Sequence, residues 1–466
     1  MPAELFRSEH DSLGSVEIPA DALWGPQTQR AVGNFQISGL RMPPEFIRAL
    51  ALIKRAAAHC NADLGLLDRD RAGAIAEAAH QVASGGHDEQ FPVDVFQTGS
   101  GTSTNMNVNE VIARLAGAHT PLPVHPNDHV NLCQSSNDVI PTAIHLASLD
   151  GLRGQLAPAC MALVESCLAR ESDIGEIAKT GRTHLMDAMP LTLGQEISGW
   201  RGLVENALQR LDAVQARLLE VPLGGTAVGT GVNAHAQFAD HCCALLATET
   251  GFRLTPSSNR FAIMSGMDAA VDLSSQLRQL ALALHKIAND LRWMNSGPNA
   301  GLAEIRLPAL QPGSSIMPGK INPVIPEAVM MACTQVVGLD LACAMAGQSG
   351  NFQLNTMLPL IAHNLLSCIR LLTGAARSLA RDAIAGFAPD AEHIAQPLAA
   401  NPVLVTALVP LIGYEKAAAI AQRAFAEHRS IAEVAAQMSG IEPKRLARLL
   451  DPLRLTRGGL NESDDD

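Results

Sequence analysis

The sequence is poor in aromatic residues and has fewer basic than acidic side chains. Only 3% of its 466 residues are aromatic, with a single tyrosine, and 34 Lys and Arg residues compare with 46 Asp and Glu residues, giving a formal net charge of −12. A positively charged surface for nucleic acid or anionic lipid is therefore not expected, nor is a platform of aromatic rings for stacked bases. We expect no nucleic-acid partner and no membrane partner.

The cysteines lack any spacing pattern. Nine of them are scattered along the chain without a CxxC pair, which excludes a recognisable disulfide framework or zinc site. We expect free thiols and a cytoplasmic location, because reduced cysteines are usual in the cytosol. The first residues, MPAELFRSEHDSLG, contain no apolar stretch after a basic start, so we expect no signal peptide. We also find no uncharged apolar run of about 18 residues and expect no membrane span.

What the sequence does contain is long helical periodicity. Apolar residues recur at alternating steps of three and four over 193–218, 273–294 and 354–379, a spacing typical of long helices packed along a common seam. Two weaker helical runs lie near 141–170 and 324–347. We therefore predict a mostly α-helical chain with a central bundle of five long helices, and no doubly wound alternation of strands and helices.

The segments on either side of this helical middle differ from it. Residues 1–134 are mixed in character, and residues 392–466 suggest short helices, so we predict three domains with boundaries at 1–134, 135–391 and 392–466. Small residues surround the long helices, which suits burial on more than one side. This favours an oligomer over a large monomeric bundle. The final residues, NESDDD, are predicted to form a solvated tail.

Loops rich in glycine, hydroxyl and amide side chains connect the predicted helices, and such loops commonly carry functional groups. In GSSIMPGKIN, two hydroxyls, Lys320 and Asn322 could donate hydrogen bonds to an anion. Composition alone favours a flexible connector with a solvated lysine. TGSGTSTNMNVNE is dense in small donors and lacks the third glycine of a dinucleotide fingerprint. A capped helix start is its alternative interpretation.

Two further segments contain histidines. HPNDHVNLCQSSND ends in two hydroxyls and an amide directly before a predicted helix, whose start could bind an anion. His125, Asp128 and His129 could suggest a metal site, but no further ligand accompanies them at a regular spacing, and we expect no metal. His184 in GRTHLMDAMP could titrate near neutral pH, although a lone histidine is more often structural. We find no cofactor motif and predict a small anionic substrate.

Taken together, these segments resemble the fumarase/aspartase superfamily, and in particular the class II fumarases. GSSIMPGKINP resembles the superfamily signature, and GSGTSTNMNVNEV, HPNDHVNLCQSSND, GRTHLMDAMPLTLGQEISGW and LGGTAVGTGVN resemble the family in the expected order. The resemblance implies a mostly helical three-domain subunit and a homotetramer with a twenty-helix core. It also implies active sites shared among three subunits, with no metal and no cofactor.

The resemblance also implies residue roles. Ser314 would be the general base that removes a proton from the carbon beside a carboxylate of malate, and His184, paired with Glu327, would act on the acid side. The positions that match substrate-binding residues are Ser100, Gly101, Thr102, Ser135, Ser136, Asn137, Thr183, Ser315, Lys320, Ile321 and Asn322. The positions that match an accessory dicarboxylate site are His125, Pro126, Asn127 and Asp128.

The implied activity is fumarate hydratase, the reversible anti elimination of water from (S)-malate through a carbanion of aci-carboxylate form. Aspartate ammonia-lyase is the alternative, because INPVIPE and AGLAEIRLPALQPGSS have aspartase character, whereas QSSND, SGNFQLN and GYEKAA are fumarase-like. A non-catalytic structural protein on the same scaffold is a third possibility. Two departures stand out: Leu122 lies where a basic residue is common, which predicts a weaker accessory site, and Asn299 lies where Arg is common.

Overall fold

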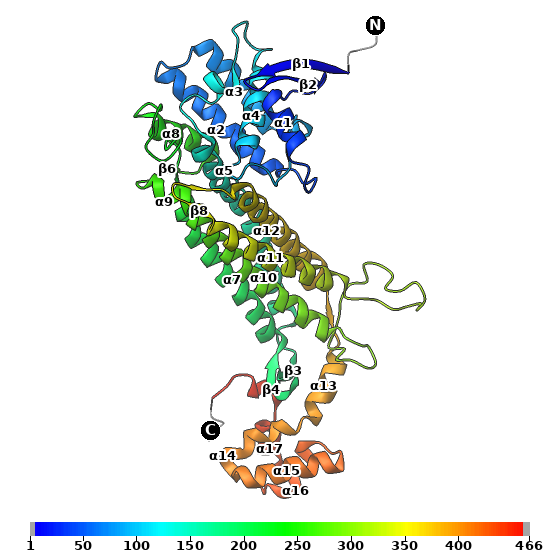
Figure 1. Cartoon of the computed structure of the whole chain (residues 1–466). Coiled ribbons are helices and arrows are strands. Elements are labelled where there is room, and N and C mark those ends of the chain that lie inside the picture. Colours follow the sequence, from blue (N-terminus) through cyan, green and yellow to red (C-terminus); the bar gives the residue numbers. More distant parts are fainter. Residues whose placement is uncertain (1–4, 460–466) are drawn as a thin grey trace. The chain divides into compact units, whose positions relative to one another are not determined.

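The computed structural model describes residues 5–459 and is mostly α-helical, as the sequence predicts (Figure 1). The predicted tail at 461–466 lies outside the described residues. The chain separates into two compact units, each made from three stretches of sequence. Unit 1 comprises 1–158, 207–281 and 333–373, and unit 2 comprises 159–206, 282–332 and 374–466. These units are not the three consecutive segments predicted above, whose boundaries remain a prediction.

Unit 1 begins with a β-hairpin and continues as packed helices. Its elements up to residue 158 are β1 (Phe6–Asp11), β2 (Gly14–Pro19), α1 (Pro26–Asn34), α2 (Pro44–Asp63), α3 (Arg69–Ala83), α4 (Thr102–Ala116) and α5 (Ser136–Gly151). Later stretches add β5 (Glu220–Val221), α8 (Phe238–Thr250), β6 (Thr255–Pro256) and α9 (Arg260–Ser265). The α2 helix packs against α3, α5 and α8. Alanines on its buried faces allow this close packing on several sides.

Five further long helices carry the periodic segments. They are α6 (Ala157–Ile174), α7 (Leu193–Leu218), α10 (Asp268–Met294), α11 (Val324–Gly347) and α12 (Leu358–Ser378). The predicted seams are buried, including Trp200 on α7, Leu284 on α10 and Leu365 on α12. The run predicted near 141–170 consists of α5 and α6, which a π-helical turn at Leu152–Leu156 joins.

The helix predicted to begin at residue 354 begins four residues later, so this boundary was wrong. Leu354 and Asn355 form strand β9, which pairs with β8 (Gly350–Asn351). The buried side chain of Asn355 donates from Nδ2 to the carbonyl of Ala346 at 2.9 Å, and its Oδ1 accepts from Met357 N at 2.8 Å. One amide therefore caps the end of α11 and the start of α12, a tertiary role that helical periodicity does not reveal.

Unit 2 contains a second hairpin and a group of short C-terminal helices. The hairpin joins β3 (Ala178–Thr183) to β4 (Met186–Thr192), and β7 (Ile305–Arg306) pairs with β10 (Ala388–Pro389). The remaining elements are α13 (Ala391–Ala400), α14 (Val409–Ile412), α15 (Tyr414–Glu427), α16 (Ile431–Met438), α17 (Pro443–Leu449) and α18 (Pro452–Leu455). Helices α15, α16 and α17 lie close together (Figure 1). They contribute to a small apolar core that includes Ile420 and Val434.

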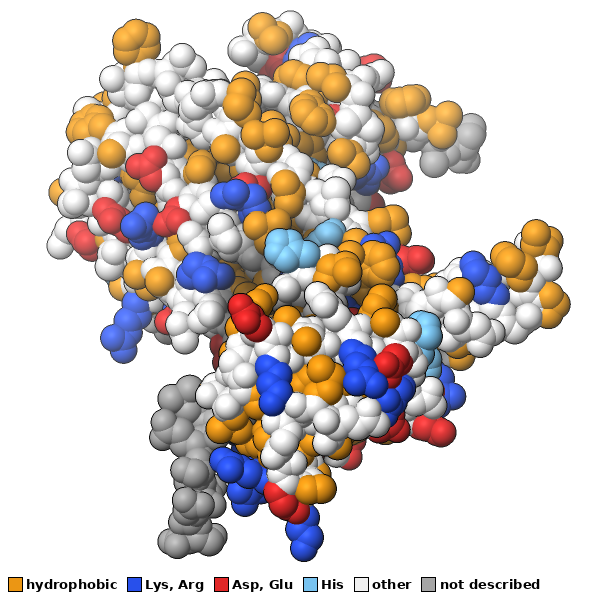
Figure 2. All heavy atoms as spheres, turned by 90° about the horizontal axis from the view of Figure 1, so that it is seen from below, with side chains coloured by type: hydrophobic (Ala, Val, Ile, Leu, Met, Phe, Trp, Pro, Cys, Tyr) orange, Lys and Arg blue, Asp and Glu red, His pale blue; other side chains and the backbone are white. Residues whose placement is uncertain are grey.

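Two helices are long and apolar enough to cross a membrane by length and composition. The α11 helix has a mean hydropathy of 1.7, and the stretch Leu358–Ile384 reaches 1.3. From the sequence we expected no membrane span, because no uncharged apolar run was long enough. The α11 helix contains Glu327 and Asp340, but its mean hydropathy is still high enough for a span. Length and composition do not distinguish a span from a helix covered by protein. The face seen in Figure 2 has cationic and anionic side chains interspersed among hydrophobic ones over its described part.

Candidate active site

Three predicted binding residues form one hydroxyl cluster in unit 1. Ser100 Oγ lies 2.7 Å from Thr102 Oγ1, which in turn lies 2.7 Å from Ser136 Oγ. Gly101 makes this possible, because it adopts φ 71° and a Cβ there would lie 2.9 Å from the side chain of Ile140. The starts of α4 and α5 therefore meet, and their N-terminal N–H groups and dipoles favour an anion at this place.

The neighbouring residues hold the start of α5 in position. Ser135 is the N-cap: its Oγ accepts from Asn137 N at 3.2 Å, and Asp138 Oδ1 accepts from Ser135 N at 2.9 Å. Asn137 Nδ2 donates to the carbonyl of Ala227 at 2.8 Å. This reciprocal capping fixes the Ser135–Asn137 turn before any ligand binds.

Two buried ionisable residues near the start of α5, Lys54 and Asp138, were not predicted from the sequence. Asp138 Oδ2 accepts from the backbone N–H groups of Gly224 at 3.0 Å and Thr226 at 2.8 Å, which ties a second loop to the start of α5. Lys54 Nζ donates to side chains of the preceding loop, at 2.9 Å from both Asn131 Oδ1 and Gln134 Oε1. A signal was available, since Lys54 interrupts the apolar stretch LALIKRAAA.

Burial controls the ionisation of this pair. It raises the pKa of Asp138 to about 6 and lowers the pKa of Lys54 to about 7. Each group partly offsets the shift of the other, because opposite charges favour each other's ionised form. Both groups are buried, and their hydrogen bonds hold the loop before α5 and the Gly224–Thr226 segment.

In unit 2, Thr183 and His184 lie at the tip of the β3–β4 hairpin. Thr183 pairs with Met186, which leaves His184 and Leu185 as the two turn residues, with φ of 56° and 59°. Positive φ at both central positions is the geometry of a tight two-residue hairpin turn. Both Thr183 and His184 are exposed, so the turn presents the two predicted side chains to the outside of the single chain.

The Ser314 segment is an exposed loop between α10 and α11 (Figure 1). The backbone of Gly313 and Lys320 closes it, with Gly313 N donating to the Lys320 carbonyl at 2.9 Å, and Asn322 Nδ2 donates to the Gly313 carbonyl at 2.7 Å. Ser314 Oγ accepts from the backbone N–H groups of Ile316 at 3.2 Å and Met317 at 3.1 Å. The loop surrounds a hollow of about 450 Å³. Ser315, Lys320 and Ile321 are exposed.

Glu327 lies in the first turn of α11 and is exposed. Within residues 5–459 of one chain, no ion pair joins it to His184. Asn299 is exposed as well. The pairing implied by the resemblance therefore remains a proposal.

The predicted accessory stretch forms a π-helical turn at Pro126–Val130. His125 Nδ1 accepts from Asp128 N at 3.2 Å, and both side chains are more than half exposed. The stretch borders a hollow of about 880 Å³ that Asn127, Leu122 and Arg114 also line.

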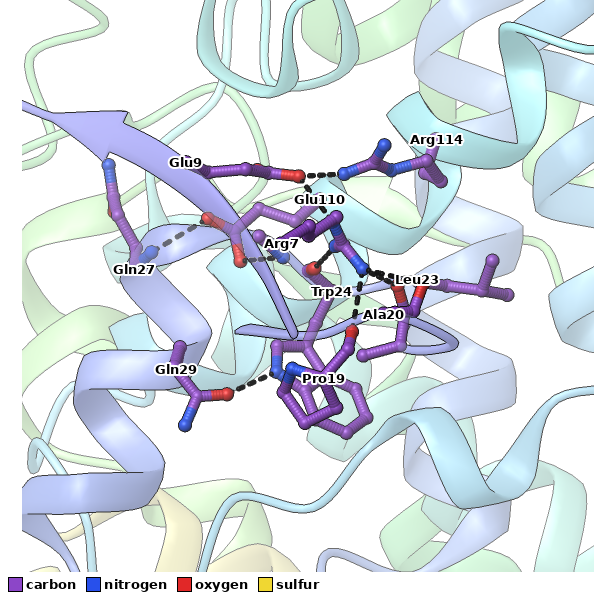
Figure 3. A network of polar contacts seen from close by, with 12 residues as sticks. Arg7, Glu9, Pro19, Ala20, Leu23, Trp24, Gln27, Gln29, Glu110 and Arg114 are labelled. Atoms are coloured by element: carbon purple, nitrogen blue, oxygen red, sulfur yellow. Dashed lines mark hydrogen bonds and ion pairs between the residues drawn. The ribbon is translucent and has the colours of Figure 1, made fainter. Parts of the chain in front are cut away.

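The arginine of that hollow is already paired. Figure 3 shows Glu9 between Arg7 and Arg114, while Glu110 accepts from Gln27 N at 2.9 Å at the start of α1. Glu9 therefore neutralises part of the Arg114 charge. The weak accessory site remains a prediction.

The described residues contain free cysteines but no cluster of potential metal ligands. All nine cysteines lie within the described residues, and each is a buried free thiol. Across residues 5–459, the structure contains no group of three or more His, Cys, Asp and Glu side chains able to hold a metal ion.

Comparisons with known proteins agree with the observed motifs. The family model described as Lyase matches residues 14–338, and the one described as fumarase C C-terminus matches residues 404–457. A "Fumarate hydratase class II" from Xylella fastidiosa is 54% identical over 459 residues, covering 98% of this chain and 97% of the relative.

Two solved structures have the same fold. A class II fumarase from Schistosoma mansoni superposes with a TM-score of 0.93 at 36% identity, covering 97% of this chain and 99% of that one. A fumarate lyase:delta crystallin from Brucella melitensis, bound to cobalt, has the same TM-score of 0.93 at 45% identity and the same coverage of 97% and 99%. The chain therefore belongs to the class II fumarate hydratase family of lyases.

Proposed function

We propose that this chain is a fumarate hydratase that interconverts (S)-malate with fumarate and water. Its membership of the family supports the reaction class. The observation that carries the proposal is the Ser314 loop, where the signature segment is intact and two backbone N–H groups point at the Ser314 hydroxyl oxygen. An elimination without a metal needs a general base, and this hydroxyl is the group that we assign to that role.

The proton to be removed is only weakly acidic, because its loss places two negative charges on one carboxyl group. Ser314 as an alkoxide would take this proton, and the N–H groups of Ile316 and Met317 favour the charged oxygen by hydrogen bonding. Lys320 and the nearby donors would stabilise the aci-carboxylate as it forms. Glycines in the loop would allow it to close over the substrate and exclude water.

The second half of the reaction is the departure of hydroxide, which needs a proton. We assign delivery of this proton to His184, directly or through a water that it holds, with Glu327 as its partner. Thr183, Ser100, Thr102, Ser136 and Asn137 would hold the carboxylates. Anti stereochemistry requires the base and the acid on opposite sides of the substrate, which suits groups supplied by separate loops.

We further propose a homotetramer whose sites combine three chains. The α11 helix supports it: only 22% of its most apolar stretch is buried in one chain, and Leu341 and Met345 are 65% and 57% exposed. So large an apolar surface usually marks a contact with protein or membrane. Tetramer formation would cover α11 and also enclose His184 and the Ser314 loop. A cytoplasmic location agrees with nine free thiols.

Aspartate ammonia-lyase is less well supported, because the matched relatives are named as hydratases. The deciding experiment supplies malate and aspartate separately and follows the ultraviolet absorbance of the unsaturated diacid. We expect absorbance to rise with malate only. Turnover of aspartate alone would replace the hydratase by the ammonia-lyase, and turnover of neither would favour the structural protein.

A further inference from the structure

A network of four charged side chains lies along the hairpin that carries His184, with Lys179 and Glu304 buried and Glu196 and Arg182 partly exposed. Lys179 Nζ lies 2.5 Å from Glu196 Oε2 and 2.8 Å from Glu304 Oε2. Glu304 Oε1 accepts from Arg182 at 2.8 Å. The side chains of Lys179 and Glu304 are 3% and 5% exposed, so little water solvates their charges. Glu304 therefore supplies the negative charge that compensates Lys179 and Arg182.

Glu304 is itself fixed in place by its backbone. Its N–H donates to the carbonyl of Met294, the last residue of α10, at 2.8 Å, and its carbonyl accepts from Asp390 N at 2.9 Å. The residue therefore connects the end of α10 to the chain just before α13. Its side chain then reaches β3 at Lys179 and at Arg182, which directly precedes Thr183.

Glu304 also begins the segment that leads to Ser314. The next two residues form β7, which pairs with β10, and a Cβ on Gly386 would lie 2.8 Å from Pro308, so the chain is packed closely up to this proline. The exposed loop starts directly afterwards. One side chain therefore joins the strand that ends at Thr183 to the fixed root of the Ser314 loop.

We propose that Glu304 is a positioning residue that fixes the His184 hairpin and the root of the Ser314 loop relative to each other. The inference rests on the proposed function, because the roles of His184 and Ser314 come from it. If sites are shared among chains, Glu304 joins loops that can serve different sites of one tetramer. A structural ion pair without this role would stabilise the fold but would leave the geometry of the two loops unchanged.

The test compares Glu304→Gln with Glu196→Gln, a matched control. Both substitutions remove one carboxylate beside Lys179, but only the first removes the partner of Arg182. We expect Glu304→Gln to lower kcat for malate about 10- to 100-fold, since small displacements of reacting groups have effects of this size. Glu196→Gln should lower kcat less than about fivefold, because its side chain is partly exposed.

The number of working sites is measured separately by calorimetry with succinate, a dicarboxylate that cannot undergo the elimination. Positioning predicts that kcat per succinate-binding site falls by a larger factor than the succinate affinity, since the Ser100 cluster is untouched while Thr183 can shift with the hairpin. The inference would be overturned if Glu304→Gln lowered only the number of succinate-binding sites and left kcat per site unchanged. Equal losses of kcat per site in Glu304→Gln and Glu196→Gln would also overturn it.

A second substitution covers the case in which Glu304→Gln does not fold. Arg182→Gln removes only the link beside Thr183, from a side chain that is 20% exposed, and leaves the pair between Lys179 and Glu304 intact. We expect a smaller fall in kcat per site, and an unchanged kcat would reject the positioning role. Absence of malate turnover in the unmodified chain would instead reject the proposed function itself.

Discussion

The hydroxyl cluster of unit 1 and the Ser314 loop of unit 2 are built in opposite ways. In the cluster, Ser100 and Ser136 are buried and hydrogen-bonded through Thr102, and the capped start of α5 fixes them. The loop is exposed at Ser315 and Lys320, and a few local hydrogen bonds within the loop hold it together. The groups proposed to bind are held by tertiary packing, whereas the group proposed to remove the proton lies on an exposed loop held mainly by local hydrogen bonds.

The difference follows from the demands on each region. Fixed donors recognise a dianion without reorganising, because tertiary packing has already oriented them. A base on a closing loop can admit water-solvated substrate and then exclude the water. We therefore expect substitution of the proposed base in the loop to act on kcat, and substitutions in the cluster to act mainly on substrate binding.

The largest effect should come from disrupting assembly. Replacing Leu341 and Met345 by Glu places charges on the apolar face of α11, and burying them would cost far more than the contact contributes. We expect dissociation of the tetramer, measured by light scattering, and loss of turnover by more than about 100-fold. Phe425→Glu, at a residue 73% exposed on α15, is the control and should leave both unchanged. A fully active single chain would disprove the shared site.

Ser314→Ala tests the loop directly. Removing a general base should lower kcat about 10²- to 10⁴-fold, with a KM for malate near that of the unmodified chain. Ser315→Ala is the matched neighbour and should act mainly on KM. Comparable kcat losses for the two serines in steady-state assays would exclude a base assigned to Ser314.

Ser136→Ala tests the preorganised cluster. It removes a hydroxyl that bonds to Thr102 at 2.7 Å, and loss of one such hydrogen bond should raise KM about tenfold with little change in kcat. Thermal unfolding serves as the control for stability. If kcat fell as much as in Ser314→Ala, the division between binding and proton transfer would be wrong.

The smallest effect on turnover is expected for a buried histidine that controls the stability of unit 1 in acid. His145 on α5 is fully buried, its Nδ1 lies 2.9 Å from the Glu220 carbonyl, and burial lowers its pKa to about 4. Because the folded pKa lies below the unfolded value, this stabilisation is present above about pH 6.5 and is lost as the pH falls through 4. We expect protonation of the buried His145 to lower the free energy of unfolding by about 3 kcal/mol.

Thermal melts between pH 7 and pH 4 measure this dependence. His145→Gln has no ionisable group and should flatten the dependence, although its stability at pH 7 will be lower. A variant that loses stability in acid as steeply as the unmodified chain would show that other groups are responsible.

Much of the fold could be predicted, because apolar spacing reflects burial directly. The seam residues of α7, α10 and α12 were identified from their periodicity and are buried. The start of α12 was misplaced, because Leu354 fits the helical spacing while the side chain of Asn355 caps two helices from a distance. The motif residues were recognisable, whereas Lys54, Asp138 and Glu304 were missed, since their importance comes from partners remote in sequence.

The amino-acid sequence by itself determined the helical class and the family, and it predicted the reacting side chains, because periodicity and short motifs depend on residues close together in the chain. Only the tertiary structure decided that Thr102 joins Ser100 to Ser136, that Asp138 holds the Gly224–Thr226 loop, and that Glu304 connects two loops. Such contacts depend on distances in space between groups far apart in the chain, and low exposure to water is what makes their charges and hydrogen bonds strong.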